Sequence, residues 1–395
     1  MRKRVIATLA ALTCCLYASA SHRPDSTGTV PKPVHYVGAD IGAAYILPSN
    51  AFFRGANATG APMTYDFSAH LKYGFRFSPE SRLGRDYPYA IQGIGVAYDS
   101  FANPAEIGRP VSVYVFQTSR IAALGDRLSF DYEWNFGASF GWKKHDYDTN
   151  PNNVVVGSRA NAYINLTLLL NWRIADSWNL RAGAGFSHFS NGNTSIPNAG
   201  VNTTGVRLGL SRSFGEERRT APQAGGSGTF QRGISYDIIL YGTLKKKGFK
   251  IGEDKYVAPG RFGVAGLSFN PLYSFSRSFK AGLSLDACFD ESANIRDHIA
   301  NDRVDPDIYL KFHRPPFREQ FSLGLSVRAE VAMPIFSVNL GIGRNFICKG
   351  ADTDGFYQTF VLKTMLGRKL FLHVGYRLYE FRQPDHLMLG IGVRL

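Results

Sequence analysis

The sequence has few cysteines, and no long apolar run follows its N-terminal segment. Four cysteines occur in 395 residues, and two of them lie within the first 20. The other two, Cys288 and Cys348, could form one disulfide at most, which excludes a disulfide framework or a zinc site. After residue 20 there is no window of about 18 consecutive apolar residues, so membrane-spanning helices are excluded. Long segments with amphipathic helical spacing are also missing, which leaves β-structure.

The first residues predict an export signal. Residues 2–4 are basic, a short apolar run follows, and residues 18–20 (Ala-Ser-Ala) are typical of a cleavage site. We therefore expect cleavage after Ala20. A lipoprotein would be modified at Cys14 or Cys15, but the residues just before them are unfavourable for that processing.

Apolar and polar residues alternate through most of the remaining chain. In 127–140 every even residue is apolar, and the odd ones are polar or small; 161–172 and 206–211 alternate in the same way. A soluble sandwich has strands of about five or six residues, whereas these runs are about ten or longer and rich in aromatics. The sequence therefore predicts an all-β, transmembrane antiparallel β-barrel in the bacterial outer membrane.

About sixteen strands are expected, joined by alternately short and long connections. The short turns are expected to be periplasmic and the long loops extracellular. The short turns are 122–126, 175–176, 277–278, 333–334 and 367–368, and the long loops are 48–63, 143–158, 191–201 and 292–320. One barrel of about sixteen strands is the commoner architecture, and two eight-stranded barrels in series are the alternative.

A polar linker divides the predicted strands into eight before it and eight after it. The predicted organisation is a signal peptide, a short periplasmic segment, a first strand region, the linker and a second strand region without a readable motif. Their bounds are 1–20, 21–34, 35–214, 215–232 and 233–395.

The seventh predicted strand carries two polar residues on its apolar face. His188 and Ser190 have the same parity as Ala184 and Phe186, so they point to the same side. That side is expected to face lipid near the extracellular end of the strand, where an unpartnered polar group costs free energy. Polar residues kept in such a place are usually functional. The alternative is a polar pair that hydrogen-bonds to lipid headgroups.

This pair has the residue types of a nucleophile and its base. A serine needs a base to take its proton, and a third polar group must orient the imidazole. Residues i and i+2 on a strand lie about 7 Å apart, within reach of a side-chain hydrogen bond. Asn202 has the parity to point outward on the next strand, while Asn191 and the Gly192 amide could serve as oxyanion donors.

These residues resemble the outer-membrane lipid A 3-O-deacylases. The family signature is a His-x-Ser-Asn run followed by a Pro-Asn-x-Gly loop, here residues 188–191 and 197–200. The resemblance covers about 35–214, and it implies His188 as base, Ser190 as nucleophile and Asn191 as an oxyanion contact.

One departure from the family concerns the third catalytic group. Asn202 stands where the best-known members carry glutamate, and no acid occurs between Asp176 and Glu216. An amide would orient the ring without adding a stabilising charge. Asp146 or Asp148 could instead orient His188 from the preceding loop.

The resemblance implies lipid A, within lipopolysaccharide, as substrate and partner. We expect its acyl chains to lie against four outward residues, namely Phe186, Leu166, Leu168 and Leu208. No metal or cofactor is needed, because nucleophile and base are both protein groups. The alternatives are a phospholipase acting on glycerophospholipids and a channel or structural barrel with an inert His–Ser pair.

The net charge of +14 does not indicate a nucleic-acid partner, because the chain is exported and has no nucleic-acid-binding module. Cations in the expected outer loops could hold lipid phosphates. They are Lys143, Lys144, Lys245, Lys246, Lys247, Lys250, Arg303 and Arg314. Four single histidines, His298, His313, His373 and His386, are expected to be rim or lumen residues.

Overall fold

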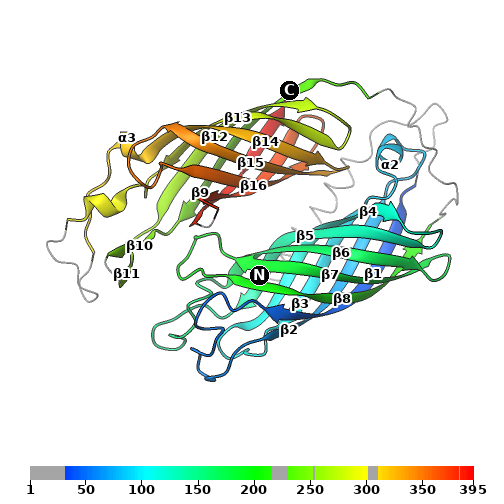
Figure 1. Cartoon of the computed structure of the whole chain (residues 1–395), viewed down its shortest axis with the longest axis horizontal. Coiled ribbons are helices and arrows are strands. Elements are labelled where there is room, and N and C mark those ends of the chain that lie inside the picture. The colour runs from blue at the N-terminus through cyan, green and yellow to red at the C-terminus, as the bar shows by residue number, and fades with distance from the viewer. Residues whose placement is uncertain (1–31, 216–229, 252–253, 301–309, 382) are drawn as a thin grey trace. The chain divides into compact units, whose positions relative to one another are not determined.

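The computed structural model describes residues 32–215, 230–251, 254–300, 310–381 and 383–395. Within them the chain forms two compact units, one on each side of the linker, and each is a β-barrel (Figure 1). The predicted signal peptide, most of the predicted periplasmic segment and most of the linker lie outside the described residues. No described helix is long and apolar enough to cross a membrane.

The first barrel is closed by eight antiparallel strands in sequence order. They are β1 (Val34–Ile46), β2 (Tyr65–Arg76), β3 (Ile91–Ser100), β4 (Gly108–Ala123), β5 (Leu128–Trp142), β6 (Ala160–Arg173), β7 (Trp178–Ser190) and β8 (Val201–Phe214). Closure is made by β8 pairing with β1, from His35 opposite Phe214 to Ile46 opposite Thr203.

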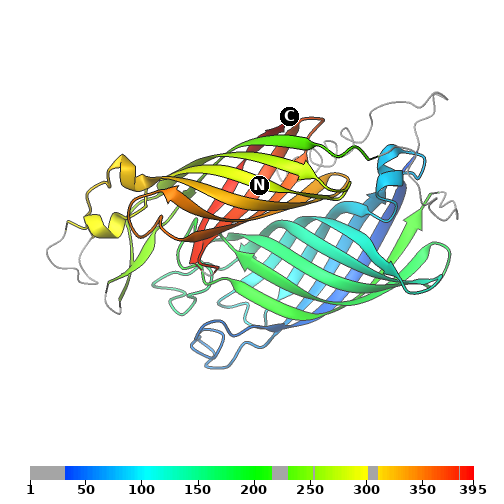
Figure 2. The same cartoon turned by 45° about the horizontal axis from the view of Figure 1, so that its top comes forward.

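The second barrel repeats this arrangement with eight further strands, and β18 pairs back onto β9. They are β9 (Ile234–Lys245), β12 (Phe262–Ser274), β13 (Phe279–Asp290), β14 (Phe321–Ala332), β15 (Phe336–Ile347), β16 (Phe356–Met365), β17 (Leu370–Tyr379) and β18 (Gln383–Arg394). Figure 2 shows both closed walls from a second direction.

The predicted class, all-β with an antiparallel barrel wall, is confirmed, and eight strands form the wall on each side of the linker. The single sixteen-stranded barrel is wrong, and the alternative of two eight-stranded barrels is the structure observed. Eight tilted strands close a sheet whose interior is just wide enough for side chains, so neither half needs the other to satisfy its edge strands.

Short additional elements lie in the connections. On the side of the short turns, α2 (Arg82–Asp86) joins β2 to β3, and its N-cap Ser81 accepts a hydrogen bond from Gly84 N. On the side of the long loops, β10 (Gly248–Ile251) and β11 (Asp254–Val257) form a hairpin between β9 and β12. The β13–β14 connection contains η1 (Ile295–His298) and α3 (Phe317–Gln320).

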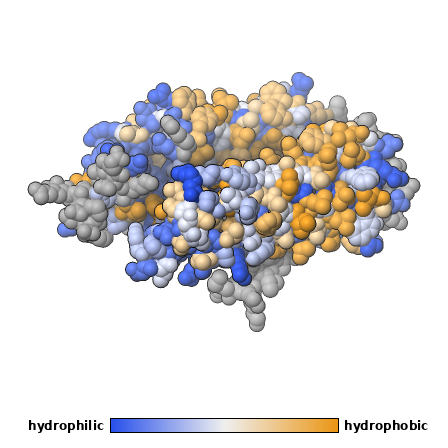
Figure 3. All heavy atoms as spheres, turned by 60° about the horizontal axis from the view of Figure 1, so that its bottom comes forward, coloured by the Kyte–Doolittle hydropathy of each residue, from blue (hydrophilic) through white to orange (hydrophobic). Residues whose placement is uncertain are grey.

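The outer surfaces of the strands are apolar. Outward residues such as Ile41, Leu71 and Val206 of the first barrel, and Leu240 and Val327 of the second, are between 60 and 68% exposed. Figure 3 shows a broad patch of such residues on the face that it draws. A water-soluble protein rarely exposes so much apolar surface, whereas a barrel wall in a bilayer requires it.

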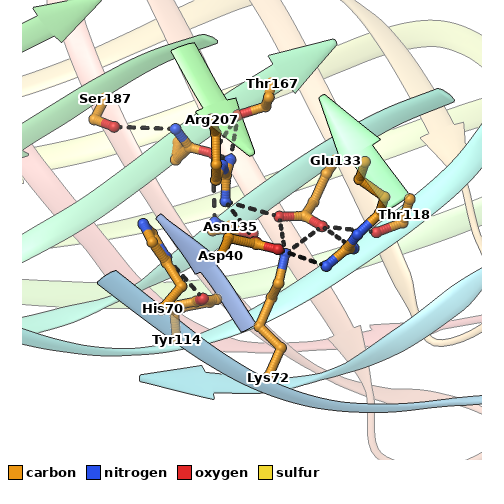
Figure 4. A network of polar contacts seen from close by, with 12 residues as sticks. Asp40, His70, Lys72, Tyr114, Thr118, Glu133, Asn135, Thr167, Ser187 and Arg207 are labelled. Atoms are coloured by element: carbon orange, nitrogen blue, oxygen red, sulfur yellow. Dashed lines mark hydrogen bonds and ion pairs between the residues drawn. The ribbon is translucent and has the colours of Figure 1, made fainter. Parts of the chain in front are cut away.

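The first barrel is filled by a buried network of charges (Figure 4). Lys72 Nζ donates to the carboxylate of Glu133 at 2.9 Å and also pairs with Asp40. Arg181 donates to Asp40 at 2.7 Å, and Arg207 donates to Glu133 at 3.1 Å. Each of these five buried charges therefore has an opposite charge beside it, which buried ions require.

Glu133→Ala is expected to destabilise the first barrel by about 3–5 kcal/mol, because it leaves buried cations without their shared carboxylate. The measurement is urea unfolding of the purified protein in detergent, followed by the loss of heat-modifiable migration on gels. Asp148→Ala, at an exposed loop position, is the control and should leave the unfolding midpoint unchanged. An unaltered midpoint for Glu133→Ala would contradict this role of the network.

The second barrel is also filled by ion pairs. Arg328 donates to both carboxylate oxygens of Asp286 at 2.8 Å. Lys363 donates to Asp237 at 2.8 Å, and Arg394 reaches the same carboxylate at 2.7 Å.

Candidate functional site

The end of β7 on the side of the long loops is fixed by one inward aromatic residue. Phe189 is 2% exposed, and its ring packs against three rings inside the barrel. The centroid distances are 5.6 Å to Phe101, 5.2 Å to Trp142 and 5.1 Å to Tyr163. Because neighbours on a strand point to opposite faces, this anchor directs His188 and Ser190 outward.

His188 joins the other two predicted site residues by hydrogen bonds. Its Nε2 lies 2.9 Å from Ser190 Oγ, and its Nδ1 lies 2.7 Å from Asn202 Oδ1. His188 and Asn202 are directly opposed partners on β7 and β8. An amide oxygen can only accept, so the proton of the neutral ring is on Nδ1 and Nε2 is left to accept from the serine hydroxyl. The arrangement can therefore draw a proton from Ser190.

The turn after Ser190 is built by its asparagines and glycine. Asn191 N donates to Asn198 Oδ1 at 3.0 Å, and Asn191 Oδ1 accepts from Ser195 N at 3.3 Å. Gly192 and Asn193 both adopt positive φ angles, of 60° and 65°. Asn191 Nδ2 is buried and has no hydrogen-bond partner among the described residues. Ser195 N thus orients this amide through its oxygen, and its nitrogen keeps an unused donor.

Gly200 packs against the imidazole from the next loop. Its φ is +71°, and a Cβ added there would lie 3.4 Å from His188 Cε1 and 2.9 Å from Phe189 O. Gly200 N also donates to Val155 O at 3.3 Å, which links the β7–β8 loop to the β5–β6 loop. The close contact of an added Cβ would therefore be with the Phe189 carbonyl, directly after His188, and glycine avoids it.

Gly200→Ala is expected to lower the rate of ester hydrolysis about 10- to 100-fold, because small displacements of a reacting group have effects of this size. The measurement is fatty-acid release by purified, folded protein. Gly60→Ala is the matched control: Gly60 has a similar φ of +66° but nothing within 4 Å of an added Cβ. Equal losses in both variants would assign the effect to backbone strain rather than to the imidazole.

The predicted acyl-chain residues lie on the outward face of β6, β7 and β8. Leu168 is opposite Ala184 and Leu208 is opposite Ala182, so both are farther along the wall from His188 than Phe186 is. Phe186, Leu166, Leu168 and Leu208 are between 43 and 54% exposed. Leu166 is the direct partner of Phe186.

The β5–β6 loop carries the acidic and basic residues that were expected to assist the site. Asp146 Oδ1 accepts from Thr149 N at 3.1 Å, and this bond lowers the pKa of the Asp146 carboxyl. Its carboxylate therefore caps its own loop, and the group beside His188 Nδ1 is Asn202. Lys143 and Lys144 are exposed, and Lys143 Nζ donates to Ala105 O at 2.9 Å.

Several basic residues expected in free outer loops have partners. Lys245 points into the second barrel between Asp290 at 2.6 Å and Asp385 at 2.7 Å, so its assignment to an outer loop is wrong. Lys247 pairs with Asp352 at 2.7 Å. Arg303 lies outside the described residues.

The four single histidines lie in the second half of the chain, two of them inside the barrel and two in a loop. His373 and His386 are buried inside the second barrel, whereas His298 and His313 lie in the β13–β14 connection. Cys288 and Cys348 are free thiols. In the described part of the chain, no three His, Cys, Asp or Glu side chains are grouped to hold a metal ion.

Sequence reasoning identified the outward residues of the site but not the residues that position them. Phe189, Trp142 and Tyr163 are inward aromatics contributed by three strands, and only the strand register brings them together. Gly200 belongs to the Pro-Asn-x-Gly loop, but its contact with His188 depends on the loop conformation.

Closed walls with apolar exteriors and charged interiors define the protein as an outer-membrane β-barrel. Two family models match the chain: Lipid A 3-O-deacylase (PagL) over residues 65–211, and Acyloxyacyl hydrolase, C-terminal domain, over 234–395. The chain therefore belongs to the lipid A 3-O-deacylase family, which indicates lipid A 3-O-deacylase activity in the outer membrane.

Several solved structures are similar to this chain at low identity and low TM-score. Neisserial surface protein A is 10% identical with a TM-score of 0.32, and the match covers 46% of this chain and 100% of that one. The siderophore receptor PirA from Pseudomonas aeruginosa is 7% identical with a TM-score of 0.27, covering 93% and 81%. An outer-membrane channel from Pseudomonas putida F1 is 10% identical with a TM-score of 0.17, covering 95% and 98%. A search of curated proteins finds no match.

Proposed function

We propose that the chain hydrolyses the 3-O-linked acyl ester of lipid A by a serine mechanism at the outer surface of its first barrel. The observation that carries this proposal is the outward chain of hydrogen bonds from Ser190 through His188 to Asn202. A hydroxyl, an imidazole and an orienting acceptor in this order are the parts of a nucleophilic ester hydrolase.

The chemistry follows from the proton positions. Ser190 Oγ attacks the ester carbonyl while His188 Nε2 takes the hydroxyl proton. The tetrahedral intermediate collapses, the bond from the carbonyl carbon to the sugar oxygen breaks, and Nε2 gives its proton to that oxygen. Water then attacks the acyl-serine with His188 again as base, which releases the fatty acid and restores the serine.

The unpartnered amide of Asn191 would stabilise the negative oxygen of the intermediate, together with the Gly192 N–H. Preorganised donors of this kind are worth about 10²–10³ in rate each. Asn191 Nδ2 suits the role because Ser195 N holds the other end of the same amide.

The substrate is expected to lie in the outer leaflet against the first barrel. The long loops of an outer-membrane barrel are extracellular, and the site is at that end of β7. Acyl chains would contact Phe186, Leu166, Leu168 and Leu208, while the exposed Lys143 and Lys144 would approach the phosphates of lipid A. This pose puts the ester at the polar boundary where Ser190 lies.

The test is to incubate the purified full chain separately with lipid A and with phosphatidylglycerol in detergent. We expect lipid A to lose the mass of one 3-hydroxy fatty acid while phosphatidylglycerol remains intact. Labelling with a fluorophosphonate should place the covalent adduct on Ser190, as a serine nucleophile requires. Hydrolysis of phosphatidylglycerol alone would instead make the protein a phospholipase.

A further inference from the structure

The second barrel has a stack of three aromatic rings on its outer surface at the end with the long loops. Phe289 and Phe321 are directly opposed on β13 and β14. Phe317 of α3 stacks on both, with centroid distances of 5.7 Å to Phe289 and 5.5 Å to Phe321. Phe317 nevertheless remains 65% exposed, so a large apolar ring is held outside the wall.

The wall beside this stack is apolar. Leu283 and Leu285 of β13, and Leu325 and Val327 of β14, share the outward parity of the two wall phenylalanines and are 42 to 64% exposed. These strands therefore offer a continuous path for acyl chains from the rings toward the middle of the wall.

Two exposed arginines are close in sequence to Phe317, the most exposed ring of the stack. Arg314 and Arg318 flank Phe317 in sequence, and both are exposed. Arg314 donates to Glu291 at 2.9 Å. No carboxylate partner of Arg318 occurs among the described residues, because the adjacent Glu319 is engaged by His298 at 2.7 Å and Lys349 at 3.6 Å. A positive charge is thus left available beside the aromatic rings.

The loops that carry these side chains are held in place by hydrogen bonds from two buried amide side chains. Asn294 Nδ2 donates to Glu319 O and to Lys349 O, both at 2.8 Å. Gln320 Nε2 donates to Glu291 O at 2.9 Å. The surface is therefore preformed, which lowers the entropy that a ligand must overcome on binding.

We propose that the β13–β14 rim, defined as Phe289, Phe317, Phe321, Arg314 and Arg318, binds a molecule of lipopolysaccharide in the outer leaflet through its lipid A part. The rings and the leucines below them would contact acyl chains, and the guanidinium groups would hold a phosphate by charge-assisted hydrogen bonds. The choice of lipid follows from charge complementarity and from the extracellular position of the long loops. Identification of the lipid as lipid A rests on the proposed function.

None of the five rim residues has a hydroxyl, thiol or imidazole, and the strand of the second barrel that corresponds to β7 has no outward hydroxyl–imidazole pair either. The seventh strand of the second barrel, β17, has Leu372, Val374, Tyr376 and Leu378 at the outward parity, where β7 has Phe186, His188 and Ser190. A lipid held on this wall meets no hydroxyl–imidazole pair on that strand. The second barrel would therefore retain the outer-leaflet lipid while the first one cleaves it.

The test counts lipid A molecules bound to the full chain by native mass spectrometry, using the Ser190→Ala protein so that no lipid is consumed. Phe317→Ala combined with Arg318→Gln is expected to remove one of two bound lipid A molecules, or to weaken it about tenfold or more, as loss of an aromatic and arginine anchor does. Arg344→Gln is the matched control: Arg344 is at the same end and 5.7 Å from the Phe356 ring, but it is paired with Asp354. It should keep both lipids.

Two further lipids test which chemical groups the rim recognises. Phosphatidylglycerol should not compete for the rim, and dephosphorylated lipid A should bind as weakly as intact lipid A binds to the double variant. Unchanged lipid A counts in the double variant, or equal retention of phosphatidylglycerol, would overturn the proposal. If the double variant fails to fold, Arg318→Glu alone should give the same loss. The proposed function fails separately, if the wild-type chain releases no fatty acid while its lipid count is unaltered.

Discussion

Ser190→Ala should abolish release of the ester-linked fatty acid from lipid A, with a fall in rate of roughly 10⁴-fold or more, as in other enzymes that lose a catalytic triad member. The hydrogen-bond partner of His188 Nε2 is Ser190 Oγ, at 2.9 Å. The variant therefore loses the hydroxyl that the base would deprotonate. The measurement is mass spectrometry of lipid A from cells that produce the variant, and from purified lipid A incubated with the variant protein.

The matched control is Ser187→Ala, three residues earlier on the same strand. Ser187 Oγ accepts from Asn165 Nδ2 at 3.0 Å and points into the barrel, so its loss should leave deacylation near the wild-type rate. His188→Ala should be as inactive as Ser190→Ala, and the double variant no worse than either, because residues that act as one unit are not additive. Lipid A that still loses its acyl chain in Ser190→Ala cells would refute the nucleophile assignment.

The outward placement of His188 and Ser190 could be predicted because side chains alternate between the two faces of a strand. In this sequence the alternation of polar and apolar residues continues over long runs. Parity alone put His188, Ser190 and Asn202 on the outer face, and the register of β7 against β8 then makes His188 and Asn202 neighbours. The same parity shows inward charges such as Glu133, but which cation it meets depends on strands far apart in sequence, since Lys72 and Arg207 come from β2 and β8.

Barrel closure could not be predicted from alternation. A strand has the same polar and apolar pattern whether its partner is the next strand or the first one, so sixteen strands are compatible with one wall or with two. The pairing of the edge strands decides between one barrel and two: β1 pairs with β8, so β8 has no free edge for β9. Loop geometry was equally hidden, because the turn that aims Asn191 and brings Gly200 to the imidazole depends on positive φ angles at Gly192, Asn193 and Gly200.

Loss of Asn202, the third residue of the site, is expected to have the second large effect on the rate of deacylation. Asn202→Leu should lower the rate of deacylation about 10²- to 10⁴-fold, since removing the group that orients the imidazole is costly even where nucleophile and base remain. Leucine is similar in size but cannot accept the proton of His188 Nδ1, which lies 2.7 Å from Asn202 Oδ1. The ring is then free to rotate away from Ser190, and the tautomer that leaves Nε2 as acceptor is no longer selected.

Asn202→Asp separates orientation from charge. Aspartate keeps the acceptor at the same place and adds the negative charge that stabilises an imidazolium, so its rate should equal or exceed that of the wild type. Thr204→Val is the control, because Thr204 is the next outward residue on β8 and its hydroxyl donates only to Gly185 O, at 3.3 Å. Rates should rank aspartate at or above asparagine, and both far above leucine, in assays of fatty-acid release by folded protein. A threefold ratio of rates corresponds to roughly 0.7 kcal/mol. If the rate of the leucine variant is within about threefold of the wild-type rate, the Asn202 contact does not orient the base.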